Sequence, residues 1–316
     1  MAVTSVPTPV PYNEFGLFHE NAAEFGLAVD ASPLVRRVEV AVERGRNVSA
    51  LLWGAGEPQL VLVHGGAQNA HTWDTVALDL GVSLLAVDLA GHGHSDWRDD
   101  GAYTPVNLAE DLAVVVRSIA PTTCAVVGMS LGGLSSMELA ARHPDLVRRL
   151  VMVDITPGVN QHKAKAVIDF VNGPQTFASF DDLLARTIEH NPTRSESSLR
   201  RGILHNAHQS ADGNWEWNYD RRSHARSRDD DTQVAEPVIS ESAISPLWDD
   251  FSAVSCPVLL VRGALSPVVD DADVVEATSR QPSLQVEVID GAGHSIQGDR
   301  PRELADLIRR EVLSRR

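Results

Sequence analysis

The sequence predicts an α/β fold built on a mostly parallel β-sheet that helices cover on both faces. Two observations predict it. Short apolar runs rich in β-branched residues recur along the 316 residues, and amphipathic stretches separate most of them. With 43% apolar and 22% charged residues, the composition is that of an ordinary globular protein. Strands that alternate with helices pair in parallel, because each intervening helix packs on a face of the sheet.

Each expected element follows from its local pattern. Residues 38–42 alternate apolar and polar side chains, and the later runs are continuously apolar, as in buried strands. The expected strands are 38–42, 46–53, 59–63, 84–87, 124–127, 150–153, 257–261 and 285–289. The expected helices are 103–119, 131–142, 164–171, 180–188 and 301–313.

Changes in composition and periodicity divide the chain into three regions. Residues 1–35 are polar, weakly periodic and punctuated by proline, so we expect an arm packed on the surface. The strand pattern occupies 36–156 and 249–316, which we expect to form one core. Between them, residues 157–248 are richer in charge, His, Asn and Trp, which indicates an insertion after the sixth strand.

Charge and hydropathy exclude several classes of protein. The net charge of −16 and the pI near 5.1 argue against nucleic-acid binding, which needs a basic footprint. No apolar run reaches the ~18 residues of a membrane span. The first eleven residues lack a basic stretch followed by an apolar one, so a signal peptide is not expected and the cytoplasm is the default location. Cys124 and Cys256 fit no metal pattern and are expected to be reduced thiols of the core.

The most informative segment is Val-Val-Gly-Met-Ser-Leu-Gly-Gly at 126–133. A strand ends at Gly128 and a helix starts directly after Ser130, so the serine lies at the apex of a very tight turn. Glycines at 128 and 132 remove side chains that would clash there. The helix N-terminus behind the serine offers free N–H groups to an oxyanion. Ser130 is therefore the candidate nucleophile.

A serine nucleophile needs a base and a group that orients the base. The candidate base is His294, which follows the last strand in the loop Asp-Gly-Ala-Gly-His. This loop belongs to the carboxyl edge of the sheet, where open α/β folds bind ligands. The acid stays ambiguous: Asp154 ends the strand after the nucleophile strand, whereas Asp270 follows the strand at 257–261. Both give the order Ser, Asp, His, and we favour Asp154.

The oxyanion hole and the pocket have weaker signals. The N–H of Leu131 is one expected oxyanion donor, and that of Gly66, in the His-Gly-Gly loop after the third strand, is the other. His64 in that loop is more simply a strand-end residue that bonds its own loop. The candidates for substrate contact are Trp73, Met129, Trp215 and Trp217. Each tryptophan could equally be a packing anchor.

Asp88, His92 and His94 lie close together in sequence, as metal ligands often do. Their spacing is loose, and Gly91 and Gly93 between them indicate a tight loop, so we do not expect a metal there. We expect the reaction to need no metal or organic cofactor. Arg221, Arg222 and the charges that follow, up to Asp231, are expected to form a solvated loop.

These motifs, in this order, resemble those of the α/β-hydrolase superfamily over about 38–155 and 255–314. The resemblance implies an eight-stranded, mostly parallel sheet with a helical cap at 157–248. It also implies that Ser130 is the nucleophile, His294 the base, and Leu131 and Gly66 the oxyanion donors. A serine at the elbow differs from the aspartate of haloalkane dehalogenases and epoxide hydrolases. Ser266 stands at the commonest acid position, but some esterases and lactonases place the acid where Asp154 stands.

The expected function is hydrolysis of a carboxylic ester or lactone of a small, fairly apolar molecule. Two alternatives stay open. One is another enzyme on the same scaffold, either a C–C bond hydrolase or a cofactor-free oxygenase. The other is a ligand-binding protein without catalysis, although such a protein has no need of a complete serine, histidine and acid set. The sequence makes no prediction about oligomeric state.

Overall fold

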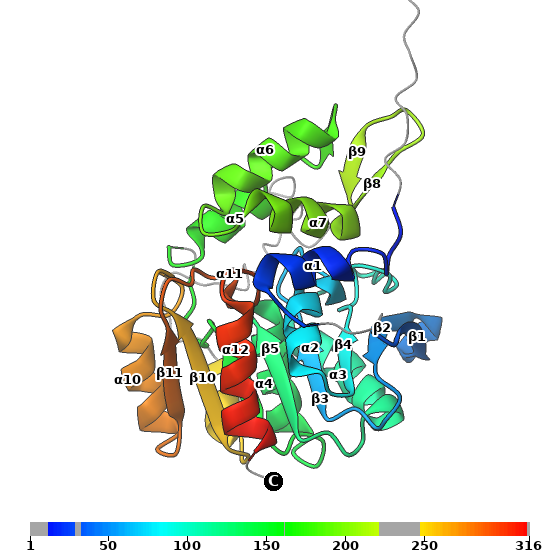
Figure 1. Cartoon of the computed structure of the whole chain (residues 1–316). Coiled ribbons are helices and arrows are strands. Elements are labelled where there is room, and N and C mark those ends of the chain that lie inside the picture. The colour runs from blue at the N-terminus through cyan, green and yellow to red at the C-terminus, as the bar shows by residue number, and fades with distance from the viewer. Residues whose placement is uncertain (1–11, 29–32, 161, 221–246, 315–316) are drawn as a thin grey trace, which may run out of the picture.

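The computed structural model describes residues 12–28, 33–160, 162–220 and 247–314 (Figure 1). Its main element is an eight-stranded sheet with the strand order β1-β2-β4-β3-β5-β6-β10-β11. β2 pairs antiparallel with both β1 and β4, and the pairs from β4 to β11 are parallel. The strands are β1 Val35–Ala41, β2 Asn47–Trp53, β3 Leu60–Val63, β4 Leu84–Val87, β5 Ala125–Met129, β6 Leu150–Val153, β10 Val258–Gly263 and β11 Gln285–Ile289. The predicted mostly parallel sheet is confirmed.

Helices cover both faces of this sheet, as predicted (Figure 1). The helices are α1 Phe18–Phe25, α2 Asp74–Leu80, α3 Pro105–Ile119, α4 Leu131–Arg142, α5 Lys165–Val171, α6 Phe180–His190, α7 Glu196–Asn206, α9 Leu247–Ala253, α10 Asp271–Arg280, α11 Ile296–Asp299 and α12 Pro301–Ile308. The helix expected at 301–313 continues past α12 as a π-helical turn, Arg309–Leu313. A short 3₁₀ turn, Ala70–Trp73, leads into α2.

The alternation of side chains along the strands divides the interior into two cores. Val61 and Val63 of β3 face one core, which α3, α4, α9 and α10 cover. Leu60 and Leu62 face the other, which α1, α2 and α12 cover. Because β3 is apolar on both faces, it can lie at the centre of the sheet. The loops at the carboxyl ends of the strands are then held from both sides.

After β6 the chain leaves the sheet, and the described residues from α5 to β9 form a separate layer over the carboxyl ends of the strands (Figure 1). The helices expected at 164–171 and 180–188 are present as α5 and α6, and α7 follows them. A small antiparallel sheet of order β7-β9-β8 adds to these helices. Its strands are β7 Thr176–Phe177, β8 Ala207–Gln209 and β9 Trp215–Trp217. The layer, which we call the cap, has its own apolar cluster around Leu183 and Ile203.

The described residues 12–28 of the N-terminal segment include a helix that the sequence analysis did not indicate. The described part of the expected arm contains α1, which lies between the cap and α2 (Figure 1). The ring of Phe18 packs 4.9 Å from that of Trp53, centroid to centroid. The tie to the cap is polar: Arg201 of α7 donates hydrogen bonds to Asn21 and Glu24 of α1. The arm therefore joins the core to the cap.

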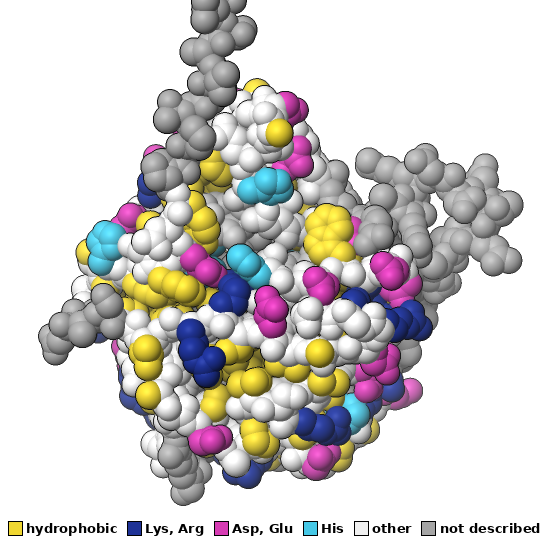
Figure 2. Space-filling view, turned by 90° about the vertical axis from the view of Figure 1, so that its right-hand side faces the viewer, with side chains coloured by type: hydrophobic (Ala, Val, Ile, Leu, Met, Phe, Trp, Pro, Cys, Tyr) yellow, Lys and Arg dark blue, Asp and Glu magenta, His cyan; other side chains and the backbone are white. Residues whose placement is uncertain are grey.

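Acidic and basic side chains lie interspersed on the face that carries the β1–β2 edge of the sheet (Figure 2). No described helix is long and apolar enough to cross a membrane. Cys124 and Cys256 are free thiols, as expected, but they are half-buried at the strand ends rather than fully inside the core. The charged segment at 221–231 lies outside the described residues.

Candidate active site

Ser130 occupies the turn between β5 and α4. Its backbone has φ 52° and ψ −121°, a conformation that residues other than glycine rarely adopt. The neighbouring glycines make this turn possible. A Cβ on Gly132 would lie 2.3 Å from the carbonyl oxygen of His64, and one on Gly128 would lie 2.3 Å from that of Gly132. The turn therefore presents the Ser130 hydroxyl above the end of the sheet.

His294 reaches Ser130 from the loop after β11. Its Nε2 lies 3.1 Å from the Ser130 Oγ, within hydrogen-bond distance. The loop packs tightly against the neighbouring strand, since a Cβ on Gly263 would lie 2.3 Å from the carbonyl oxygen of Gly293. Asp299 of α11 accepts a hydrogen bond from the N–H of Gly293 at 2.7 Å and holds the loop from the other side.

Asp154 completes this chain of side chains. Its Oδ2 lies 2.8 Å from the Nδ1 of His294, and its carboxylate is fully buried. The Oδ1 accepts a hydrogen bond from the N–H of Gly263 at 2.9 Å, and the hydroxyl of Ser266 donates to Oδ2. The sequence did not reveal this role of Ser266. The available signal was that Ser266 follows β10 while Asp154 follows β6. These two strands are neighbours in the sheet, so their ends lie side by side.

Asp270, the alternative acid, lies at the start of α10 and not beside His294. It is the N-cap of α10, where its side chain accepts from the N–H of Asp273 in a capping box. Its second oxygen lies 3.0 Å from the ammonium of Lys163. These contacts use its carboxylate to start a helix and to anchor the cap. The structure brings Asp154, and not Asp270, to His294.

The expected oxyanion donors lie beside the serine. Leu131 is the first residue of α4, so its N–H is one of those that a helix leaves unpaired at its start. Gly66 lines the same pocket as Ser130 and His294. A Cβ placed on Gly66 would lie 3.9 Å from the Leu131 side chain, which shows how close the two loops are. The following residue, Ala67, has a φ of 57°, so this loop turns sharply.

The pocket over Ser130 is a small cavity of about 240 Å³ between the core and the cap. Its apolar walls come from Met129, Ala166, Val167, Phe170, Val171, Leu265 and Pro267. Met129 was a predicted contact, whereas the α5 residues were not identified from the sequence. The apolar positions of 164–171 could have suggested them, but nothing in the sequence shows which face of that helix meets the core.

The tryptophans proposed as pocket walls need correction. Trp73 is completely buried in the apolar core and does not line the pocket over Ser130. Trp215 packs inside the cap, with its ring 5.0 Å from that of Phe180. Trp217 lines a second cavity rather than the pocket over Ser130. Tryptophan in this chain is thus mostly a packing residue.

His64 bonds its own loop, as the sequence suggested. The Nδ1 of His64 bonds the carbonyl oxygen of Gly65 at 2.7 Å, and its Nε2 accepts from the N–H of Leu89 at 2.9 Å. Asp88 accepts from Arg37 and from the N–H of His94 at 3.1 Å. The Asp88 carboxylate therefore holds the loop that follows β4. A Cβ on Gly93 in this loop would lie 2.5 Å from that carboxylate, so the glycine leaves room for it.

Comparison with known proteins agrees with this architecture. A family profile described as the alpha/beta hydrolase fold matches residues 58–301. The chain is 42% identical to esterase Rv0045c of Mycobacterium tuberculosis over 94% of this chain and 95% of that one. It is 30% identical to 2-(acetamidomethylene)succinate hydrolase of Mesorhizobium japonicum over 77% and 83% of the two chains.

Solved structures give the same result. A crystal structure of Rv0045c from M. tuberculosis superposes with a TM-score of 0.80, at 42% identity, over 96% of this chain and 98% of that one. A structure of E-2-(acetamidomethylene)succinate hydrolase gives a TM-score of 0.75 at 26% identity over 88% and 98%. The profile match covers most of the chain, and the first relative spans nearly all of it. The chain belongs to the α/β-hydrolase family.

Proposed function

We propose that the protein is a serine hydrolase that cleaves a carboxylic ester or lactone of a small, fairly apolar molecule. One observation carries the proposal: the side chains of Ser130, His294 and Asp154 form a continuous hydrogen-bonded chain at the floor of the pocket. That arrangement supports nucleophilic attack by serine. The similarity to an esterase supports ester cleavage over the other chemistries of the scaffold.

In the proposed reaction, the Ser130 oxygen attacks the ester carbonyl while the Nε2 of His294 takes the hydroxyl proton. Asp154 keeps the other ring nitrogen of His294 protonated and stabilises the imidazolium. The N–H groups of Leu131 and Gly66 bind the tetrahedral oxyanion. His294 then gives its proton to the leaving alcohol, and an acyl group stays on Ser130. His294 next activates water, which releases the acid and restores the serine.

The pocket supports the proposed class of substrate. Its apolar walls suit an acyl chain or a ring, and its volume of about 240 Å³ suits a small molecule. Because no substrate charge needs to be balanced at these apolar walls, neutral esters are the first compounds to test. The chemical step itself involves only groups of the chain and water.

The deciding experiment is intact-mass analysis after exposure to a fluorophosphonate, which phosphonylates activated serines. We expect one adduct on the wild type and none on Ser130→Ala. Matched assays with short-chain p-nitrophenyl esters should show turnover by the wild type only. A folded wild-type protein that forms no adduct and cleaves no ester or lactone would contradict the proposal.

A further inference from the structure

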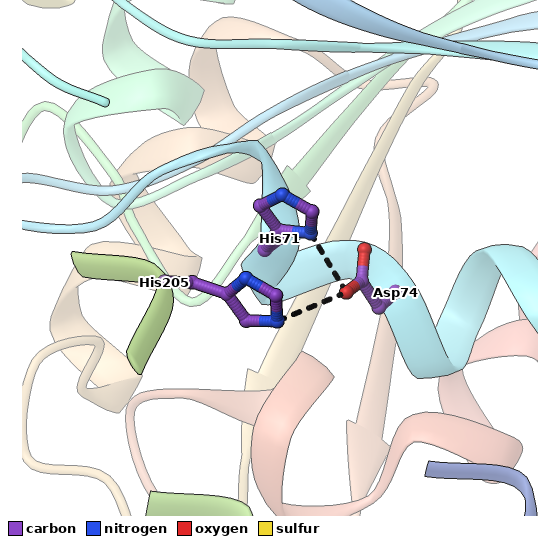
Figure 3. A group of neighbouring side chains, drawn as sticks. All are labelled: His71, Asp74 and His205. Carbon is purple, nitrogen blue, oxygen red and sulfur yellow. Dashed lines mark hydrogen bonds and ion pairs between the residues drawn. The ribbon is translucent and has the colours of Figure 1, made fainter. Parts of the chain in front are cut away.

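Away from Ser130, three buried side chains meet where the cap touches the core (Figure 3). His71 belongs to the 3₁₀ turn before α2, and Asp74 is the first residue of α2. His205 comes from the last turn of the cap helix α7. Each side chain is 3% exposed. No part of the proposed ester hydrolysis uses them.

Both histidines face the Asp74 carboxylate (Figure 3). The Nδ1 of His71 lies 2.9 Å from Asp74 Oδ2, and the Nε2 of His205 lies 3.8 Å from it. The latter distance is too long for a hydrogen bond. The Nε2 of His205 and the Oδ1 of Asp74 are both buried without a hydrogen-bond partner among the described residues. Burying such groups unpaired is costly, so the arrangement points to a ligand.

The outer ring nitrogens of the two histidines are already held. The Nε2 of His71 lies 3.2 Å from Glu14 Oε1, and the Nδ1 of His205 lies 2.8 Å from the hydroxyl of Tyr12. Histidines that bind metals usually use one ring nitrogen for the ion and the other for a carboxylate or another polar group. The three inner ligand atoms lie within 4.8 Å of one another.

A cavity of about 120 Å³ borders the three side chains. Zinc commonly takes three protein ligands and leaves its fourth position to water, and the cavity has room for that water. The cavity and the pocket over Ser130 share the lining residues Ala67, Gln68, Phe170 and Asn191. The cluster therefore lies beside the catalytic pocket but outside it.

We propose that His71, Asp74 and His205 bind a divalent transition-metal ion such as zinc, which ties the cap to the core. Two imidazoles and one carboxylate suit such an ion better than they suit magnesium or calcium, which prefer oxygen ligands. The rings now stack in parallel, with centroids 3.8 Å apart and an angle of 9° between their planes.

A metal ion held by these three side chains would supply a partner for the buried Nε2 of His205, which has no hydrogen bond among the described residues.

The test is titration calorimetry of chelator-treated protein with zinc chloride. We expect one zinc per chain in the wild type. His205→Gln should weaken binding by more than about 100-fold, because even the loss of an outer partner costs 10–100-fold. Tyr12→Phe, which removes only such a partner, should weaken it by about 10-fold. The matched control is His208→Gln, an exposed histidine three residues away, which should bind zinc like the wild type.

Two further measurements separate loss of the site from loss of the fold. Thermal unfolding without zinc shows whether His205→Gln is folded, and Asp74→Asn provides a second variant. Zinc should raise the Tm of the wild type and of His208→Gln, and should slow hydrogen exchange in α7. Zinc binding that persists unchanged in His205→Gln and Asp74→Asn but disappears in His294→Gln would assign the ion to the catalytic histidine and overturn the proposal. A wild-type protein that binds no zinc would also overturn it.

Discussion

Asp154 is held in one orientation by more than its contact with His294. Its φ of 51° places it in a backbone conformation that non-glycine residues rarely adopt. Its two oxygens accept from the N–H of Gly263, from Ser266 and from His294. A carboxylate that is fully buried and accepts three hydrogen bonds has little freedom to turn away from the histidine.

The first prediction compares the two candidate acids. Asp154→Asn should lower kcat on an ester by about 10⁴-fold, because an amide favours the wrong imidazole tautomer. Asp270→Asn should leave kcat and Tm near wild type, since asparagine caps a helix as well as aspartate does. Steady-state kinetics of both variants checks this. A large loss in Asp270→Asn together with a normal Asp154→Asn would reverse the assignment.

The second prediction concerns Ser266 as a positioning residue. Ser266→Ala removes one donor to the buried carboxylate, and a hydrogen bond to a charged group is worth about 1.5–3 kcal/mol. We expect kcat to fall by roughly 10-fold or more, by that measure, with little change in KM. Ser266→Thr, which keeps the hydroxyl, should restore most of the rate. Equal losses in both variants would point to packing instead.

At this scale, the sequence predicted the residues whose signals are local. Ser130 lies inside its own turn signature, and His294 lies in a glycine-rich loop directly after a strand. The choice between Asp154 and Asp270 depended on which loop reaches the histidine, and that is settled by contacts between distant segments. The sequence analysis also missed the cluster of His71, Asp74 and His205, because His205 comes from the cap and is distant in sequence from the other two.

Among the elements, the start of helix α4 packs closely against the end of strand β3. Helix α4 starts so close to β3 that a Cβ on Gly132 would lie 2.3 Å from the His64 oxygen and 2.5 Å from the Val63 oxygen. Both are backbone atoms, which cannot move aside as the end of a flexible side chain can. The start of the helix is therefore fixed by the strand beside it.

The third prediction tests this packing. Gly132→Ala should lower the Tm markedly and abolish fluorophosphonate labelling, because α4 must shift and Ser130 with it. The control is Gly202→Ala in α7, where a Cβ would meet nothing within 4 Å. That change should raise stability by about 0.5–1 kcal/mol, since alanine favours helix over glycine. Thermal melts and labelling of both proteins decide the matter.

Elements with strong periodicity were predicted to within a few residues, and three strands were predicted with their observed bounds: β4, β6 and β11. The sequence analysis did not indicate α7 and α10, although they are 11 and 10 residues long, and it also missed several shorter elements. Helix α1 is only eight residues long and packs against α2 and α7. The cap strands β7, β8 and β9 are two or three residues each, too short to show a period.

For the whole molecule, a buried ion-pair network connects the N-terminal segment to the sheet. Arg37 of β1 bonds Glu14 ahead of α1, Ser49 of β2 and Asp88 after β4. The Asp88 side chain is fully buried, and Arg37 is its ion-pair partner. Removing one member of such a pair leaves a charge without compensation inside the protein.

The fourth prediction follows from that network. Arg37→Met should reduce the free energy of unfolding by about 3–5 kcal/mol. Arg44→Met, which removes an exposed pair with Asp100 at 3.9 Å, should change it by less than about 0.5 kcal/mol. Urea unfolding of both variants measures the difference. Similar midpoints for the two would show that the Asp88 charge is balanced elsewhere.

The wall of the catalytic pocket that α5 provides has a consequence for how the enzyme could diversify. The reacting groups all stand on loops of the sheet, whereas Ala166, Val167, Phe170 and Val171 belong to the cap. In the proposed reaction, bond cleavage thus rests on the sheet loops, whereas α5 supplies the part of the apolar wall that belongs to the cap. A library randomised at those four positions should yield variants with new chain-length preferences that still react fully with fluorophosphonate. Selectivity could then drift while the catalytic machinery stays constant.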